Sequence, residues 1–242
     1  MSTQSGRVAV ITGAGRGIGR AVALELAREG YRLCLAARTR EQLEDTRALT
    51  ALAPKDSLIV LLDLADTEAP AALIETAIAH YGQLDVLVNN AGFGPPRRAV
   101  TKVSEADQDR MIAVNLRAPI ALTRLAAAQM LKQGTGAIVN VASIAGLRSP
   151  AMEAIYAATK AGLIAFTRAC FNELREGGVR VSVITPGLVD TALIPANKHL
   201  ERSLMLSPAN VALAIRQILS SPPGMCPVEM VVEPDRNPER LR

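Results

Sequence analysis

Aromatic side chains are scarce in this sequence: Phe, Tyr and Trp together make up 2% of its 242 residues, and tryptophan is absent. Surfaces that bind nucleic acids typically combine clustered basic residues with aromatic ones. Here the 27 Lys and Arg residues are scattered along the chain, and the formal net charge is only +4. We therefore expect no nucleic-acid partner, and a core built from Val, Ile, Leu and Ala.

Cysteine is rare as well. Cys34, Cys170 and Cys226 are too few and too irregularly spaced for a disulfide framework or a zinc site, and no group of His, Cys and carboxylate residues indicates a metal. No apolar run reaches the roughly 18 residues that span a bilayer. No signal-peptide pattern precedes Val8. These absences predict a cytoplasmic protein with no metal and no membrane association.

The rest of the composition is typical of a folded domain: 49% of the residues are hydrophobic and 21% are charged. No linker or shift in composition divides the chain, so we expect one domain over residues 1–242. The segment Pro234–Arg242 is charged and contains proline. It is expected to be a frayed tail.

Short apolar runs rich in β-branched residues alternate with longer stretches of helical periodicity. This alternation predicts an α/β protein with a single-domain, Rossmann-like doubly wound fold: a seven-stranded, mostly parallel sheet with helices on both faces. In such a sheet, ligands bind beyond the carboxyl ends of the strands. The strands are expected at Val8–Ile11, Arg32–Ala36, Leu58–Leu62, Val86–Asn89, Ala137–Val141, Arg180–Ile184 and Pro227–Val231, and the helices at Gly17–Arg28, Arg40–Ala51, Ala69–Tyr81, Ser104–Lys132, Ile155–Glu176 and Pro208–Leu219.

A glycine-rich loop follows the first predicted strand and leads directly into a predicted helix. It reads Thr12-Gly13-Ala14-Gly15-Arg16-Gly17-Ile18-Gly19. Glycines let the backbone approach a pyrophosphate closely, and a helix N-terminus turns free N–H groups and a positive dipole end toward it. A purely structural turn is the alternative. The spacing Thr-Gly-x3-Gly-x-Gly resembles the dinucleotide-binding loop of the short-chain dehydrogenase/reductase family.

The end of the second predicted strand bears on the choice of cofactor. A carboxylate here would accept the ribose hydroxyls of NAD and repel the extra phosphate of NADP. The sequence instead has uncharged Ala37 followed by Arg38, and Arg16 in the glycine loop is a second basic candidate. A guanidinium binds a phosphate well, although both arginines could equally be solvated surface residues. In the family this pattern implies NADP(H), which is the cofactor we expect.

Three further strand ends match motifs of the same family. Asp63 follows the third strand, Asn89-Asn90-Ala91-Gly92 the fourth, and Pro186-Gly187-Leu188-Val189-Asp190-Thr191 the sixth. The resemblance implies that Asp63 binds the adenine amino group, that the backbone of Leu64 reaches the ring, and that the Asn-Asn-Ala-Gly motif leaves room for a ribose. It also implies that the backbone near Val189 and the Thr191 hydroxyl hold the nicotinamide carboxamide, and that Pro186 and Gly187 are further cofactor-binding residues. From the residues alone, Asp63 could equally be a simple helix cap or turn residue.

Tyr156 and Lys160 lie four residues apart in "YAATK", which puts both on one face of a helix. A nearby ammonium would lower the pKa of a tyrosine from about 10 toward working pH. Ser143 ends the fifth strand, and its hydroxyl could bind a substrate carbonyl oxygen. Asn115 lies inside a predicted helix, either at a kink or as a tolerated polar residue. The resemblance implies a catalytic Asn-Ser-Tyr-Lys tetrad, in which Asn115 holds a water that links Lys160 to solvent and Lys160 orients the nicotinamide ribose.

The substrate is less well defined by the sequence. Besides Ser143 and Tyr156, contacts are expected from aliphatic residues, which favours a small or medium apolar carbonyl; these residues are Ile144, Leu147, Met152, Leu188 and the segment Ala192–Met205, a lid in the family. Arg97 and Arg98 could attract a carboxylate or phosphate, or be solvated. The C-terminal region lacks the Gly-Gly pair of many family members and loosely resembles a subgroup that includes 3-hydroxy-acid dehydrogenases.

A carrier-bound thioester remains an alternative substrate. In reductases of carrier-protein thioesters, docking arginines stand where this chain has Gly134 and Gly177, which weakens that interpretation. Lys132 and Arg175 lie close enough to keep it open.

Together these patterns predict an NADP(H)-dependent oxidoreductase that interconverts a carbonyl and a secondary alcohol, with a 3-oxo or 3-hydroxy acid or a 3-oxoacyl thioester as candidate substrate. Family members pair the helices that contain Asn115 and Tyr156 with their counterparts, so a homo-oligomer, a dimer or tetramer, is expected. The alternative is a catalytically silent NADP-binding regulatory protein of the same fold.

Overall fold

The computed structural model describes residues 6–94, 97–194 and 199–239. Within these residues, seven strands form one sheet in the order β3-β2-β1-β4-β5-β6-β7, and every neighbouring pair is parallel. The predicted sheet is therefore confirmed, and it is wholly rather than mostly parallel. The strands are β1 Val8–Thr12, β2 Arg32–Ala37, β3 Ser57–Leu61, β4 Val86–Asn89, β5 Gly136–Val141, β6 Val179–Pro186 and β7 Glu229–Val232.

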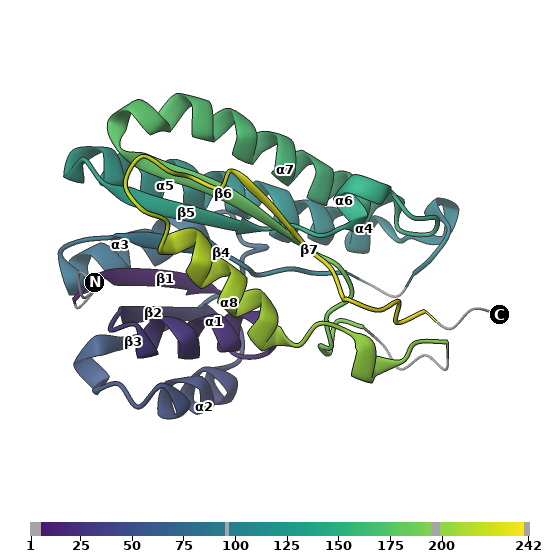
Figure 1. Ribbon diagram of the computed structural model, residues 1–242, viewed down its shortest axis with the longest axis horizontal. Helices are drawn as coiled ribbons and strands as arrows, with labels where there is room; N and C mark the ends of the chain where they lie inside the picture. The colour runs from purple at the N-terminus through teal and green to yellow at the C-terminus, as the bar shows by residue number, and fades with distance from the viewer. Residues whose placement is uncertain (1–5, 95–96, 195–198, 240–242) are drawn as a thin grey trace.

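Helices cover both faces of the sheet (Figure 1). Alternation along β1 shows how the two layers are built: Ala9 and Ile11 pack in the cluster that contains α1 and α8 residues, whereas Val8 and Val10 pack with α3 and α5. The predicted Rossmann-like fold class is thus confirmed. The helices are α1 Gly17–Arg28, α2 Arg40–Thr50, α3 Ala69–Tyr81, α4 Glu105–Ile112, α5 Ala118–Gln133, α6 Ala145–Arg148, α7 Ala154–Leu174 and α8 Pro208–Leu219, with 3₁₀ turns at Pro54–Asp56, Val100–Lys102, Arg175–Gly177 and Arg202–Leu204.

The long helix expected over Ser104–Lys132 is interrupted. A π turn, Ala113–Arg117, joins α4 to α5 and places Asn115 at its centre. Pro119 has no N–H to donate to the carbonyl of Asn115 four residues earlier, so a regular α-helix would lose a hydrogen bond at this point. The predicted irregularity at Asn115 therefore takes the form of a widened turn.

The same stretch bears on the expectation that no apolar run is long enough to span a bilayer. The continuous helical run Glu105–Gln133 is long and apolar enough to cross a membrane, judged by length and composition alone. Of its most apolar window, 56% is buried inside the protein. Its α5 part packs against α3, α7 and β5, as a core helix does.

A buried polar ladder ties the centre of the sheet together. Asn89 on β4 donates to the side-chain oxygen of Asn140 on β5 at 2.8 Å and to the hydroxyl of Thr123 at 3.2 Å. Asn140 in turn donates to the hydroxyl of Thr167 on α7 at 2.8 Å. Because a shift in strand register would leave buried amides unpaired, this ladder fixes how β4 and β5 align. It therefore sets the relative positions of the two strand ends, which carry Asn90 and Ser143.

The C-terminal segment does not fray where the structure describes it. The N–H of Glu201 donates to the carbonyl of Pro238 at 2.8 Å, and Leu200 forms an antiparallel bridge with Glu239. Pro238 is buried. The expectation of a frayed tail is wrong for residues 234–239, because they pack against the segment after β6; residues 240–242 lie outside the described part of the chain.

Candidate active site

A cavity of about 1160 Å³ opens at the carboxyl edge of the sheet, where the doubly wound fold is expected to bind ligands. Residues at the ends of all seven strands and at the start of α7 line it. The predicted site residues that line it are Gly13, Gly15, Arg16, Gly17, Ile18, Arg38, Asp63, Leu64, Asn90, Ala91, Gly92, Ser143, Ile144, Met152, Tyr156, Lys160, Pro186, Gly187, Leu188, Val189 and Thr191. The remaining four, Thr12, Gly19, Asn89 and Asn115, lie behind the lining and support it.

Thr12 joins the ends of β1 and β4. Its hydroxyl accepts the N–H groups of Asn90 and Ala91, both at 3.0 Å. The side-chain amide of Asn90 returns a hydrogen bond to the carbonyl of Thr12 at 2.9 Å. The side chain of Thr12 is 1% exposed, so its part is to shape the cavity rather than to touch a ligand.

The glycine loop is shaped first by contacts within the protein. A Cβ on Gly19 would lie 2.2 Å from the carbonyl oxygen of Gly13, and one on Gly13, whose φ is +66°, would lie 2.9 Å from the Asn90 side chain. Only glycine, which has no Cβ, fits at these two positions without a clash. Gly17, with φ +54°, is different, because a Cβ there would meet only Thr191 within 4 Å, at 3.4 Å. Part of the loop thus exists for packing, and Gly17 opens onto the cavity.

The start of α1 suits an anion. Arg16 stands at the N-cap with no side-chain cap, and the first turn of the helix contains no acidic residue. The first N–H groups of a helix have no partner within it, so they and the helix dipole favour a negatively charged ligand. The residues present therefore fit the pyrophosphate of a dinucleotide.

Two basic side chains, Arg16 at the start of α1 and Arg38 directly after β2, lie where the adenosine end of a dinucleotide is expected. Both are exposed and both line the cavity. Arg38 has one distant ion-pair contact, 3.9 Å from its Nη1 to Oδ2 of Asp63. Among the described residues, no ion pair or hydrogen bond engages the Arg16 guanidinium. Both arginines can therefore turn toward a phosphate bound at this end.

Asp63 is both a turn residue and part of the cavity lining, so both interpretations given for it from the sequence fit its position. Its Oδ1 accepts the N–H of Ala65 at 3.0 Å, which closes a turn, and its carboxylate also lines the cavity. Its Oδ2 accepts from Arg110 at 2.7 Å. Burial by itself raises the pKa of this carboxyl, but the Ala65 N–H and the Arg110 guanidinium outweigh burial and hold the pKa below its ordinary value. Asp63 is consequently a charged acceptor at neutral pH.

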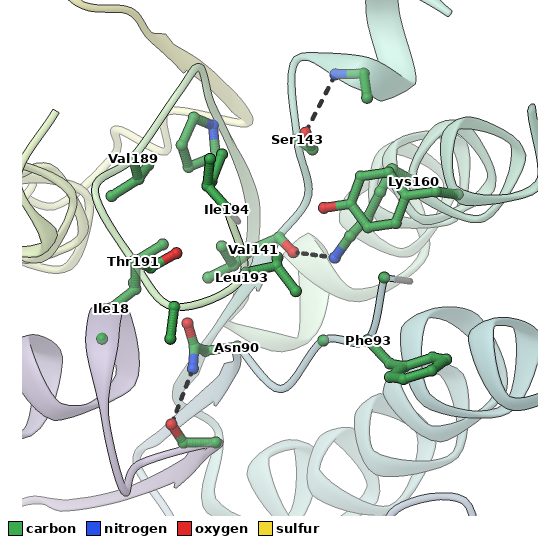
Figure 2. Close-up of a pocket in the computed structure, with 18 of the residues that line it drawn as sticks. Ile18, Asn90, Phe93, Val141, Ser143, Lys160, Val189, Thr191, Leu193 and Ile194 are labelled. Atoms are coloured by element: carbon green, nitrogen blue, oxygen red, sulfur yellow. Dashed lines mark hydrogen bonds between the residues drawn. The ribbon is translucent and has the colours of Figure 1, made fainter. Parts of the chain in front are cut away.

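Three of the four predicted catalytic side chains converge in the cavity. Ser143 follows β5, Tyr156 lies in the first turn of α7, and Lys160 lies one turn later. The Ser143 oxygen accepts the N–H of Ala145 at 3.2 Å, and Lys160 Nζ donates to the carbonyl of Val141 at 2.9 Å (Figure 2). Lys160 Nζ lies 5.8 Å from the centre of the Tyr156 ring.

The pKa of the tyrosine differs from the sequence-based expectation. Burial raises the pKa of Tyr156 to about 12; a hydrogen bond with Ser143 acts in the lowering direction and Glu153 in the raising one. Burial also lowers the pKa of Lys160 to about 8. Lys160 was expected to lower the pKa of the phenol, but its ammonium bonds to the Val141 carbonyl, and burial dominates.

Asn115 holds the segment after β4 against α7. Its side-chain oxygen accepts the Phe93 N–H at 2.8 Å, and its amide donates to the Phe93 carbonyl at 2.7 Å and to the Thr159 hydroxyl at 3.4 Å. A Cβ on Gly92 would lie 3.7 Å from Asn115 Oδ1 and 3.9 Å from Lys160 Nζ. The backbone at Gly92 therefore runs between these two side chains. The water-holding role of Asn115 stays a prediction.

The substrate end is largely aliphatic. Ile144, Met152 and Leu188 line the cavity as expected, whereas Leu147 is 43% exposed and does not line it. Within the expected lid Ala192–Met205, the cavity is lined by Ala192, Leu193, Ile194 and Leu200, and residues 195–198 lie outside the described part.

Ion pairs and the tail complete the rim. Arg97 pairs with Glu153, and the backbone N–H of Arg98 donates to the Met152 carbonyl at 2.9 Å. On the opposite side, Arg148 pairs with Glu233, beside tail residues that also line the cavity. The tail, Arg110 and Phe93 were not predicted from the sequence, because only the tertiary fold brings them to the strand ends.

Among the described residues, no three His, Cys, Asp or Glu side chains form a group that could hold a metal ion.

Known proteins share this sequence and architecture. The sequence model described as short chain dehydrogenase matches residues 7–201. An uncharacterized oxidoreductase of Staphylococcus aureus (strain USA300) is 34% identical over 97% of this chain and all of its own length.

Two solved structures are similar in fold as well as in sequence. One is a metagenomic short-chain oxidoreductase in complex with NADP, with a TM-score of 0.84, 34% identity, and coverage of 97% of this chain and 100% of that one. The other is a 3-ketoacyl-(acyl-carrier-protein) reductase from Brucella melitensis complexed with NADH, with a TM-score of 0.87, 29% identity, and coverage of 96% and 98%. The match over residues 7–201, together with the glycine loop and the Ser-Tyr-Lys group in one cavity, shows that this chain belongs to the short-chain dehydrogenase family and is an oxidoreductase.

Proposed function

We propose that this oxidoreductase uses NADP(H) to interconvert a carbonyl and a secondary alcohol. One observation carries the proposal: Ser143, Tyr156 and Lys160 line the same cavity as the glycine loop with its Arg16 and the Arg38 side chain that follows β2. Dinucleotide binding and acid–base chemistry therefore share one cavity. The NADP complex of a relative with a TM-score of 0.84 supports the choice of cofactor.

The bound cofactor would supply hydride to the carbonyl carbon, or accept it from the alcohol. Ser143, whose oxygen accepts the Ala145 N–H and whose hydroxyl also bonds with Tyr156, would donate its hydrogen bond to the substrate oxygen when substrate is bound. Tyr156 holds the proton that the substrate oxygen gains in reduction. A pKa of about 12 keeps this phenol protonated at neutral pH, which is the state that reduction needs. Lys160 holds a positive charge beside the phenol.

The lining favours a small or medium apolar carbonyl as substrate. Ile144, Met152, Leu188 and Leu193 present aliphatic surface beside Tyr156 and Ser143. The 3-ketoacyl reductase similar in structure keeps 3-oxo acids and 3-oxoacyl thioesters among the candidates.

The test is NADPH oxidation by the purified protein across a carbonyl panel, with Tyr156→Phe measured beside it. The panel contains free 3-oxo acids, 3-oxoacyl thioesters, diketones, aldehydes and small ketones. We expect turnover with at least one class of carbonyl. Tyr156→Phe should lose this turnover but bind NADPH as the wild type does, because the phenol oxygen transfers the proton and is not needed to hold the cofactor. A catalytically silent regulator would bind NADPH tightly and turn over none of the panel.

We also propose that the protein is a cytoplasmic homo-oligomer. Apolar side chains on the outer surface of the α4–α5 run remain exposed in the single chain, among them Ile112 at 42% and Ile120 at 37%. Small residues on α7, including Ala154 and Ala158, are also exposed and would allow a second helix to approach closely. Sedimentation of the purified protein tests this, with a single-chain mass of 25.6 kDa as the result that would refute it.

A further inference from the structure

The carboxylate of Asp63 faces two arginines at the end of the cavity where the adenosine would bind. Both contact the same oxygen, Oδ2: Arg110 Nη2 lies 2.7 Å away and Arg38 Nη1 lies 3.9 Å away. The other oxygen is engaged by the Ala65 N–H at 3.0 Å. Arg110 therefore has the close ionic contact, and Arg38 only a distant one.

Arg110 is also the better anchored of the two arginines. Its guanidinium lies 5.5 Å from the centre of the Phe93 ring, so the ring face and the carboxylate hold it from two sides. Its side chain is 31% exposed, against 58% for Arg38. The Asn115 side chain hydrogen-bonds both the N–H and the carbonyl of Phe93, so the position of this residue is itself fixed. Arg110 can stay on Asp63 while Arg38 moves.

The charges at this end would otherwise oppose a phosphate. An ionised carboxylate repels the phosphate that distinguishes NADP from NAD, and it attracts any arginine near enough to pair with it. Asp63 is ionised at neutral pH, so its negative charge attracts both nearby guanidinium groups. With Arg110 in close contact, much of that charge is neutralised without Arg38.

Building on the NADP(H) preference proposed above, we propose that Arg110 is a positioning residue for the choice of cofactor. By neutralising Asp63, it leaves the Arg38 guanidinium available for the 2′-phosphate. Without Arg110, Arg38 becomes the nearest counter-ion of Asp63 and is drawn away from the phosphate. The carboxylate can still accept the adenine amino group, a contact that NAD and NADP share.

The experiment measures the ratio of the dissociation constants of NADH and NADPH, read from the change in nicotinamide fluorescence on binding, without turnover. Competition by 2′,5′-ADP and by 5′-AMP repeats the comparison without the nicotinamide. We expect Arg110→Met to lower the preference for NADPH and for 2′,5′-ADP about tenfold, the order expected for one charge about 4 Å from its partner near a solvent-exposed rim. Arg110→Lys keeps the charge and should keep most of the preference.

Arg117→Met is the matched control. Arg117 extends from the π turn to the carbonyl of Ala65 at 2.6 Å, so it contacts the same β3–α3 turn but not the Asp63 carboxylate. Its replacement removes the same charge from the same neighbourhood. The preference for NADPH should stay near the wild-type value if the effect runs through Asp63.

A double variant separates positioning from general damage. In Arg110→Met/Asp63→Asn the carboxylate that captures Arg38 is gone, so the preference for NADPH should recover, even if both cofactors bind more weakly through the lost adenine contact. Because that loss is common to NADH and NADPH, it cancels in the ratio. Structural damage caused by Arg110→Met would not be repaired by the second substitution.

The outcomes distinguish this inference from the proposed function. If the wild type binds NADPH no better than NADH, the proposed cofactor preference fails and the inference fails with it. If the wild type prefers NADPH and Arg38→Met abolishes the preference, the proposed function stands. In that case an unchanged ratio in Arg110→Met, or no recovery in the double variant, overturns the role of Arg110 alone.

Discussion

Replacing Lys160 by Met should make the protein more stable at neutral pH while abolishing catalysis. The side chain of Lys160 is 3% exposed, and burial lowers its pKa from 10.5 to about 8. At 1.36 kcal/mol per pKa unit, this means that burying the charged amine costs the folded state about 3 kcal/mol. Methionine has a similar length and no charge. Its gain is reduced by about 1 kcal/mol, because the carbonyl of Val141 loses its donor. The free energy of unfolding should therefore rise by about 2 kcal/mol at pH 7.

The pH dependence of the free energy of unfolding tests this prediction. Because the pKa of Lys160 is lower in the folded state, the unfolded chain binds more protons between about pH 8 and pH 10.5, and wild-type stability contributed by this residue increases with pH over that interval. The advantage of Lys160→Met over the wild type should therefore shrink when urea unfolding is repeated at pH 9.5, because the tyrosines and cysteines that also titrate there are common to both proteins and cancel in the difference. Lys132→Met, at an exposed lysine of α5, serves as the control. A difference that does not change with pH, or a variant less stable at pH 7, would refute the reasoning.

Three further substitutions test the support of the cavity. Gly19→Ala should weaken NADPH binding at least tenfold and lower the melting temperature, because its Cβ would lie 2.2 Å from the carbonyl oxygen of Gly13; fluorescence titration and calorimetry measure both. Arg20→Met should raise the dissociation constant of NADPH several-fold with little effect on the KM of the carbonyl, since Arg20 holds the Gly15 carbonyl at 2.6 Å behind the loop. Glu233→Gln should have the converse effect, a several-fold higher carbonyl KM with unchanged NADPH binding, since it loosens the pairing with Arg148 at the substrate end.

Most of the fold could be predicted because its signals are local. The apolar runs and the residues after them locate the strands: β4 lies at Val86–Asn89 and α1 at Gly17–Arg28, as predicted. The Tyr156–Lys160 spacing places both side chains on one face of α7 for the same reason, since four residues make about one helical turn. Such patterns need no knowledge of distant contacts.

The features that the sequence did not predict all depend on distant contacts. The Arg110–Asp63 pair joins residues 47 apart in sequence, and Arg148 joins Glu233 across 85. The raised pKa of Tyr156 also depends on tertiary burial, which a spacing of four residues does not reveal. For the tail, the charged composition predicted fraying, but hydrogen bonding to the segment after β6 offsets the cost of ordering it.

The docked tail has a practical consequence for how the protein is handled. The segment that follows β7 ends its described course at Glu239, which lines the cavity, whereas β1 begins at the amino edge of the sheet, away from the cavity (Figure 1). A tag or label attached to the chain at this segment would begin at the cavity wall and compete with substrate there. Kinetic constants are therefore best measured on protein purified through an N-terminal tag, or after the C-terminal tag has been cleaved.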